Sequence, residues 1–310
     1  MTAPLLKKTG LRLTLVGLGD VGGTLLTALK LLGDEIDEIG VYDPYGPLID
    51  RYCMELGQVL ERPTPRIVRR EEEALFDCDV FLFAASRGVP PVGTGGDVRM
   101  LQFEGNRALL KRYAKQARAS GFSGLFCQIS DPVDLLCRCV YWQSNTDESG
   151  NFDGRGLSEH QIVGFGLGVM AARAQYYARL QGLDPAKVAA FGPHGKGLVI
   201  ANDLDDYDDA LSLALTKTTV EANRAVRALG FKPYIAPALS SACISLLHLL
   251  RGTPFYGAIP TDGVYFGCLA RWTERGAVPL HDTSALPAPL QRRIARAMME
   301  LKEMESLCRL

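Results

Sequence analysis

One histidine differs from the other three in this chain by its setting. His194 lies in Gly192-Pro193-His194-Gly195-Lys196-Gly197, a glycine-rich turn between two short apolar segments, whereas His160, His248 and His281 lack such a setting. An imidazole titrates near neutral pH, so it can exchange a proton with a hydroxyl or carbonyl group of a substrate. Acid–base chemistry at His194 is one hypothesis, and a histidine that is merely packed in a turn is the other.

A second motif predicts a dinucleotide site. An apolar run at 13–16 continues into Gly17-Leu18-Gly19-Asp20-Val21-Gly22, and a helix is expected at 24–32. The first glycine of such a motif permits a tight turn, the second lets backbone approach a pyrophosphate, and the third lets helix pack on strand. Asp43 follows a predicted strand at 38–42, where an acid binds ribose hydroxyls and disfavours NADP. A glycine turn without a ligand is the alternative. The motif therefore predicts NAD binding at Gly17, Gly19, Asp20, Val21, Gly22 and Asp43.

The elements that must position these residues alternate along the first half of the chain. Strands are expected at 66–68, 79–85 and 124–129, and helices at 48–60, 99–119 and from about 132. Apolar strands alternating with helices are typical of a parallel sheet covered on both faces, whose ligands lie at the carboxyl ends of the strands. The loops that start at Gly17, Asp43, Ser86 and Ser130 should therefore meet at one crevice, with Ala85 and Ser130 as further cofactor contacts.

The second half has a different pattern. Strands are expected at 161–166, 188–191, 198–201, 255–259 and 264–270, and helices at 167–181, 206–229, 238–250 and 287–310. We predict an α/β protein: a Rossmann-type doubly wound parallel sheet in an NAD-binding domain at 1–150, followed by an α+β substrate domain at 151–310. The glycine- and proline-rich segment 86–98 is either a mobile lid or an ordinary surface loop. The polar segment 144–156 is expected to be a solvated excursion.

Composition excludes several classes of protein. Lys and Arg number 34 against 35 Asp and Glu, so nothing indicates nucleic acid or an anionic membrane surface as a partner. The eight cysteines show no CxxC pair and no nearby histidine, which favours buried thiols in a reducing cytoplasm and no metal site. No apolar stretch approaches the roughly 20 residues that span a bilayer. We expect a cytoplasmic protein.

These motifs occur in an order and spacing that resemble the lactate/malate dehydrogenase family over nearly the whole chain. Arg99, seven residues before Asn106, resembles the lid arginine that polarises the substrate carbonyl. Arg173, which follows Gly164-Phe165-Gly166, resembles the arginine that binds the substrate carboxylate, a task suited to a bidentate guanidinium. The turn at 192–195 resembles the catalytic histidine turn, and 129–134 resembles the motif that follows a central strand. The resemblance implies a homodimer or homotetramer that acts on a small 2-oxo or 2-hydroxy acid.

Three positions bear on the substrate pocket that the resemblance implies. Ser240 falls where the family places small pocket-lining residues. Gly93 aligns near the position that distinguishes lactate-like from malate-like substrates, and the absence of a cation there disfavours a second substrate carboxylate. Met170 stands where the family carries the aspartate that orients and charges the histidine. A thioether cannot accept the imidazole N–H or stabilise an imidazolium.

Asp131 offers a replacement for that aspartate. It stands where the family usually has asparagine, close to the histidine and the substrate oxygen. A carboxylate at this position could partly replace the one lost at Met170, although unrelated drift at both positions would give the same sequence.

Two functions remain open. The first is an NAD-dependent 2-hydroxyacid dehydrogenase of the L-lactate type, with catalytic residues His194, Arg173, Arg99 and Asp131 and an activity weakened by Met170. The second is a catalytically impaired relative that binds NAD(H) as a sensor or structural protein. Retention of Arg99, Arg173 and His194 favours the enzyme, because a sensor of the dinucleotide alone needs none of them.

Overall fold

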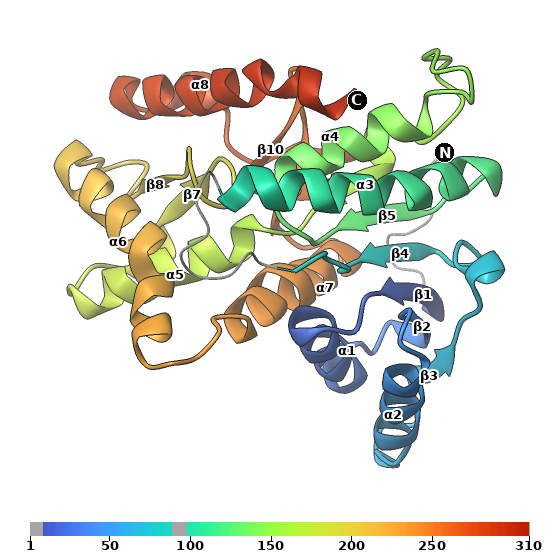
Figure 1. Ribbon diagram of the computed structural model, residues 1–310. Helices are drawn as coiled ribbons and strands as arrows, with labels where there is room; N and C mark the ends of the chain where they lie inside the picture. The colour runs from blue at the N-terminus through green and yellow to red at the C-terminus, as the bar shows by residue number, and fades with distance from the viewer. Residues whose placement is uncertain (1–8, 89–97, 310) are drawn as a thin grey trace.

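A nine-stranded, mostly parallel sheet runs through the molecule (Figure 1). The computed structural model describes residues 9–88 and 98–309. The strand order is β11-β10-β9-β6-β5-β4-β1-β2-β3. A separate hairpin is formed by β7 (Ala189–Phe191) and β8 (Val199–Ala201). The strands of the large sheet are β1 (Leu11–Val16), β2 (Ile36–Tyr42), β3 (Arg66–Arg69), β4 (Val80–Phe83), β5 (Leu125–Gln128), β6 (Ile162–Gly164), β9 (Phe255–Thr261), β10 (Val264–Thr273) and β11 (Gly276–Pro279).

The first six strands give the sheet a doubly wound topology. They pair in parallel, and β1 lies between β2 on one side and β4 on the other. The chain therefore reverses its winding direction at β1. The edge of the sheet at the carboxyl ends of β1 and β4, where sheets of this kind bind ligands, is called the crevice below. β9, β10 and β11 extend the sheet with antiparallel pairing. The predicted fold class is confirmed, whereas the domain boundary at residue 150 stays a prediction.

Helices cover both faces of this sheet, and Figure 1 shows α3, α4 and α8 above it with α1, α2 and α7 below. α5, α6 and the β7–β8 hairpin lie together beside it. The helices are α1 (Asp20–Leu32), α2 (Gly46–Gly57), α3 (Val98–Ala119), α4 (Val133–Ser144), α5 (Leu167–Leu180), α6 (Asp209–Ala228), α7 (Ser245–Leu250) and α8 (Ala288–Glu303).

Two predicted elements need correction, and one strand was missed. α1 begins at Asp20, not at residue 24, because Gly22 and Gly23 form part of its first turns. The segment Pro237–Ile244, expected as the start of an α-helix, is a π-helix that continues into α7. β11 was not predicted at all. It is a short edge strand whose pairing depends on the neighbouring β10.

The main core lies on both faces of the large sheet. All four residues of β4 and of β5 are buried, as continuous apolar runs predict. The Phe81 ring of β4 stacks on Phe76, which precedes the strand, and lies tilted against Phe126 of β5. A smaller core joins α5, α6 and the β7–β8 hairpin. Most of the cysteines are buried, and all eight are free. In the described ranges, no helix is long and apolar enough to cross a membrane.

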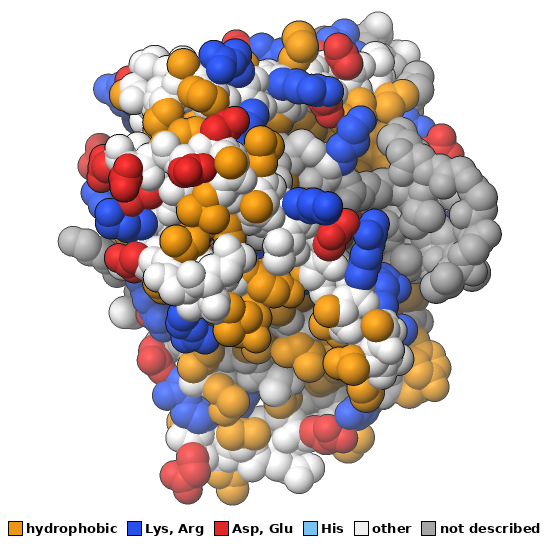
Figure 2. Space-filling model, turned by 90° about the vertical axis from the view of Figure 1, so that its left-hand side faces the viewer, with side chains coloured by type: hydrophobic (Ala, Val, Ile, Leu, Met, Phe, Trp, Pro, Cys, Tyr) orange, Lys and Arg blue, Asp and Glu red, His pale blue; other side chains and the backbone are white. Residues whose placement is uncertain are grey.

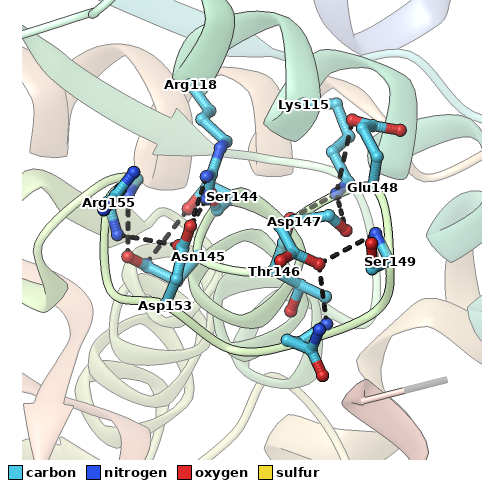
Figure 3. A network of polar contacts seen from close by, with 12 residues as sticks. Lys115, Arg118, Ser144, Asn145, Thr146, Asp147, Glu148, Ser149, Asp153 and Arg155 are labelled. Carbon is cyan, nitrogen blue, oxygen red and sulfur yellow. Dashed lines mark hydrogen bonds and ion pairs between the residues drawn. The ribbon is translucent and has the colours of Figure 1, made fainter.

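The loop after α4 is more ordered than the predicted solvated excursion (Figure 3). Arg118 of α3 binds the Asp153 carboxylate through two nitrogens, at 2.7 and 2.5 Å, which holds the pKa of Asp153 well below its usual range. Asn145 is buried and accepts a hydrogen bond from the backbone N–H of Gly156. The prediction is therefore wrong for the ends of the segment, which pack against the protein, and correct for its exposed middle.

Candidate active site

The glycine motif lies at the crevice beside β1, and two of its glycines are required by the protein itself. Gly17 has φ +94°, and a Cβ there would lie 2.5 Å from the backbone N of Ala85. A Cβ on Gly22 would lie 1.9 Å from the carbonyl oxygen of Gly17. Both contacts are far below van der Waals separation, so side chains at these positions would force β1, β4 and α1 apart.

Gly19 differs from Gly17 and Gly22 because no nearby protein atom requires a glycine at this position. It is exposed, and a Cβ there would meet nothing within 4 Å. The open space faces the N-terminus of α1, whose free N–H groups and positive dipole end favour an anion. A glycine that the fold does not need, at a helix start that attracts phosphate, fits the pyrophosphate of a dinucleotide.

Gly19→Ala should therefore separate binding from folding. We expect the free energy of unfolding to change by less than about 1 kcal/mol, and the Kd for NADH to rise about tenfold or more, because a Cβ would occupy space that the phosphates need. Thermal unfolding and fluorescence titration measure the two effects. Gly57→Ala is the matched control, since a Cβ there also meets nothing within 4 Å. Unchanged NADH affinity in Gly19→Ala would contradict the cofactor assignment.

Asp43 connects the end of β2 to the glycine loop. Its Oδ2 accepts a hydrogen bond from the backbone N–H of Leu18 at 2.9 Å, and its Oδ1 accepts one from Tyr45 at 3.0 Å. Asp20, in the first turn of α1, pairs with Lys232 at 3.0 Å, and Val21 beside it is half-buried. The carboxylate of Asp43 thus lies at the crevice, with lone pairs left for further donors.

The loops after β4 and β5 are joined at the same crevice. Ser130 is buried, and its hydroxyl donates to the carbonyl oxygen of Ala85 at 2.6 Å. The Asn106 amide donates to the carbonyl oxygen of Asp131 at 2.7 Å and accepts from the backbone N–H of Arg87 at 2.9 Å. In the sequence, Asn106 serves only to mark the spacing to Arg99. In the fold, its buried side chain holds both loops in place.

His194 and Asp131 meet across this edge of the sheet. His194 Nδ1 lies 3.0 Å from Asp131 Oδ1, with 16% of the histidine side chain and 49% of the aspartate side chain exposed. The carboxylate can accept the Nδ1 proton, which leaves Nε2 for a substrate. This is the contact that the proposed replacement of the missing aspartate requires.

Close backbone packing fixes the turn at 192–197, called the histidine turn below. The backbone N–H of Gly192 donates to the carbonyl oxygen of Gly267 in β10 at 2.8 Å. A Cβ on Gly267 would lie 2.3 Å from the carbonyl oxygen of Gly192. On the other side, a Cβ on Gly166 would lie 3.0 Å from the Cβ of His194. The histidine turn can pack this closely because glycines occupy the facing positions in β10 and at the start of α5.

Arg173 lies on α5 with neutral hydrogen-bond partners. It donates to the Asn223 side-chain oxygen at 2.5 Å and contacts the Met170 sulfur at 3.5 Å. Burial lowers the pKa of Arg173, and the charge of Asp131 opposes that effect. Within residues 9–88 and 98–309, Arg173 forms no ion pair. Met170 is 3% exposed and follows Gly166 by one turn, on the side of α5 that approaches His194. A half-buried guanidinium without an acid is suited to an anionic ligand.

The predicted pocket serine, Ser240, lies half-buried in the π-helix next to a more constrained neighbour. Ser241 is buried, donates to the carbonyl oxygen of Gly166 and accepts from the backbone N–H of Val169. The π-helix is thereby joined to the start of α5, beside the histidine turn. Such helices occur frequently at functional sites. The assignment of Ser240 to a substrate pocket stays a prediction.

The predicted lid lies largely outside the described residues. Gly93 belongs to 89–97, and Arg99 is placed only by its backbone, in the first turn of α3. The assignments of Arg99 and Gly93 stay predictions. Asn223 was missed by sequence analysis and carries no motif. Across the two described ranges, no group of three His, Cys, Asp or Glu side chains could hold a metal ion.

Known proteins of similar sequence and structure are dehydrogenases. The chain is 26% identical over 196 residues to the L-lactate dehydrogenase of Mesomycoplasma hyopneumoniae and 28% identical over 195 residues to L-lactate dehydrogenase 2 of Staphylococcus aureus. These matches cover 62% and 61% of this chain, but only 57% and 56% of the relatives. No family model matches the chain.

Solved structures match almost the whole fold. The minor L-lactate dehydrogenase from Enterococcus mundtii matches with a TM-score of 0.79 and 18% identity, over 97% of this chain and 99% of that one. Malate dehydrogenase from Archaeoglobus fulgidus, solved in complex with NADH, has the same TM-score and identity, over 96% and 99%. The chain therefore shares the Rossmann-type α/β fold of these two dehydrogenases. The L-lactate dehydrogenase relatives confirm the resemblance to the lactate/malate dehydrogenase family.

Proposed function

We propose that this protein is an NAD-dependent oxidoreductase that interconverts a 2-oxo acid and a 2-hydroxy acid of the lactate-like, monocarboxylic type. The observation that carries the proposal is the guanidinium of Arg173, half-buried without an acidic partner among the described residues and within electrostatic reach of the His194–Asp131 pair. A carboxylate bound to Arg173 would place its 2-carbon next to an acid–base group. A pure dinucleotide sensor would need neither.

The residues at the crevice fit a dinucleotide. Gly19 leaves room for the pyrophosphate at the start of α1, and Asp43 can accept the ribose hydroxyls while repelling a 2′-phosphate. We therefore propose NAD(H) in preference to NADP(H). When bound, NAD(H) would supply or accept the hydride.

Each catalytic residue has one assigned task. Arg173 binds the substrate carboxylate through two nitrogens, for which Asn223 holds the guanidinium in place. His194 gives the proton to the substrate oxygen during reduction and takes it back during oxidation. Asp131 holds the imidazole and stabilises its protonated form. Arg99 polarises the carbonyl, an assignment that rests on the sequence resemblance alone.

The proposal also covers the oligomeric state and the cellular location of the protein. We propose a homodimer or homotetramer, which fits the hydrophobic side chains exposed on the side of the molecule that carries α6 (Figure 2). We also propose a cytoplasmic location, in keeping with the free cysteines.

A panel of 2-oxo acids tests the function. We expect NADH, but not NADPH at equal concentration, to be oxidised with monocarboxylic acids of one side-chain size range and much more slowly with dicarboxylic ones. Absorbance at the nicotinamide band reports turnover, and fluorescence titration reports NADH binding separately. If NADH binds and no acid is turned over, the enzyme proposal fails. The alternative, a catalytically impaired sensor favoured by Met170, would then stand.

A further inference from the structure

A buried carboxyl lies beneath the histidine turn and has no task in the mechanism above. Asp134, in the first turn of α4, is 6% exposed, and its Oδ1 has no hydrogen-bond partner among the described residues. Burial raises the pKa of Asp134 to about 7, although the backbone N–H groups of Asp134 and His194 and the His194 ring lower it. Leaving a polar atom buried and unpaired costs free energy, so the position calls for a physical explanation.

The titratable groups that face Asp134 belong to the loop before α4, the histidine turn, β10 and α4 itself. Asp131 precedes it in the same loop and raises the pKa of Asp134, and His194 approaches from the histidine turn. Cys137 of α4 and Cys268 of β10 also face it; burial, and secondarily the charge of Asp134, raise the pKa of both thiols. Among these described groups, His194 alone can become positive, so a negative Asp134 has one charge partner.

We propose that Asp134 is a positioning residue for His194: its buried carboxyl aligns the backbone of the histidine turn and, with Asp131, stabilises the protonated imidazole. Asp131 acts on the ring through Nδ1 at 3.0 Å. Asp134 acts from the buried side, where its neighbour Val133 and the Cβ of His194 each lie 3.0 Å from the position of a Cβ on Gly166. Together the two carboxyls supply the negative charge beside His194 that the thioether of Met170 cannot provide. The role rests on the proposed acid–base function of His194.

Coupling between the two groups follows from their proximity. A protonated His194 favours ionised Asp134, and ionised Asp134 favours protonated His194. Asparagine at 134 keeps the shape and an acceptor oxygen but removes the charge. Leucine removes both, so the two variants separate charge from alignment.

The test uses the intact protein and histidine NMR, with the His194 resonances assigned through His194→Gln. We expect Asp134→Asn to move the midpoint of the His194 titration to lower pH by about half a unit or more, with the pH–rate profile following it. Asp134→Leu should shift the midpoint likewise and also lower kcat. Cys137→Ala, one turn along α4, controls for packing and should leave the midpoint in place. A midpoint in folded Asp134→Asn equal to that of the wild type would overturn the proposal.

A measurement on the wild type covers the case in which the variants fail to fold. The carboxyl carbon of Asp134 should titrate near neutral pH, far above an ordinary aspartate, and His194→Gln should move that titration upward. An Asp134 titration that is the same in the wild type and in His194→Gln would overturn the proposal. Because neither NMR readout needs turnover, failure of every 2-oxo acid would refute the proposed function without deciding the role of Asp134.

Discussion

Replacing His194 with glutamine is expected to lower kcat for reduction of the 2-oxo acid by about 10²- to 10⁴-fold, the usual contribution of a general acid. Glutamine can still donate a hydrogen bond to the substrate oxygen, but it cannot transfer a proton at neutral pH. The Kd for NADH should change by less than about twofold, because the crevice at Gly19 and Asp43 is built from other elements. Steady-state kinetics and fluorescence titration measure the two quantities.

His248 provides the matched control. It lies exposed on α7, where Nδ1 contacts the carbonyl oxygen of Pro254 at 3.1 Å. His248→Gln should leave kcat within about twofold of the wild type, since it is distant from the proposed chemistry. If His194→Gln retains more than about a tenth of the wild-type kcat, the imidazole is not the general acid. The proton donor would then have to be sought elsewhere.

The parallel part of the sheet was predictable because its sequence signals are local. Strands buried on both faces, such as β4 and β5, appear as continuous apolar runs, and the turn after β1 needs glycine for steric reasons visible in its motif. The π-helix at Pro237–Ile244 has no such signal, because its apolar pattern also suits an ordinary helix. The edge strand β11 forms through its partner β10, which no local pattern reveals.

The candidate site also contains residues that the sequence identifies and residues that only the fold reveals. Motif residues such as His194 and Arg173 could be named from the sequence, but the side chains that hold them could not. Asn223 lies fifty positions from Arg173 and reaches it only because α6 packs on α5. The burial of Asp134 depends on β10 and the histidine turn, both far along the chain. Contacts of this kind belong to the tertiary structure, so single-sequence patterns do not contain them.

Asp131→Asn is expected to have an effect as large as the loss of the histidine. Removing the carboxylate that orients a catalytic histidine can cost on the order of 10⁴ in kcat, because the ring loses its tautomer and its stabilising charge. Here Asp131 Oδ1 lies 3.0 Å from His194 Nδ1, and no aspartate stands at 170 to compensate. We expect kcat to fall about 10²-fold or more across pH 6–8, with NADH affinity unchanged. Equal activity in the wild type and in Asp131→Ala would remove Asp131 from the mechanism.

Met170→Asp in the Asp131→Asn background should restore much of that loss. Residue 170 follows Gly166 by one turn on the face of α5 near His194, so a carboxylate there is placed to take over the Nδ1 proton of the imidazole. Met170 is 3% exposed, and a buried charge lowers stability unless it is paired, so the rescued variant should also unfold at a lower temperature. Met170→Asn in the same background is the control: it brings a polar group without charge, and it should not rescue. Rescue by aspartate alone would show that one negative charge beside His194 suffices from either position. Rescue by neither variant would mean that Asp131 acts on the substrate oxygen and not on the histidine.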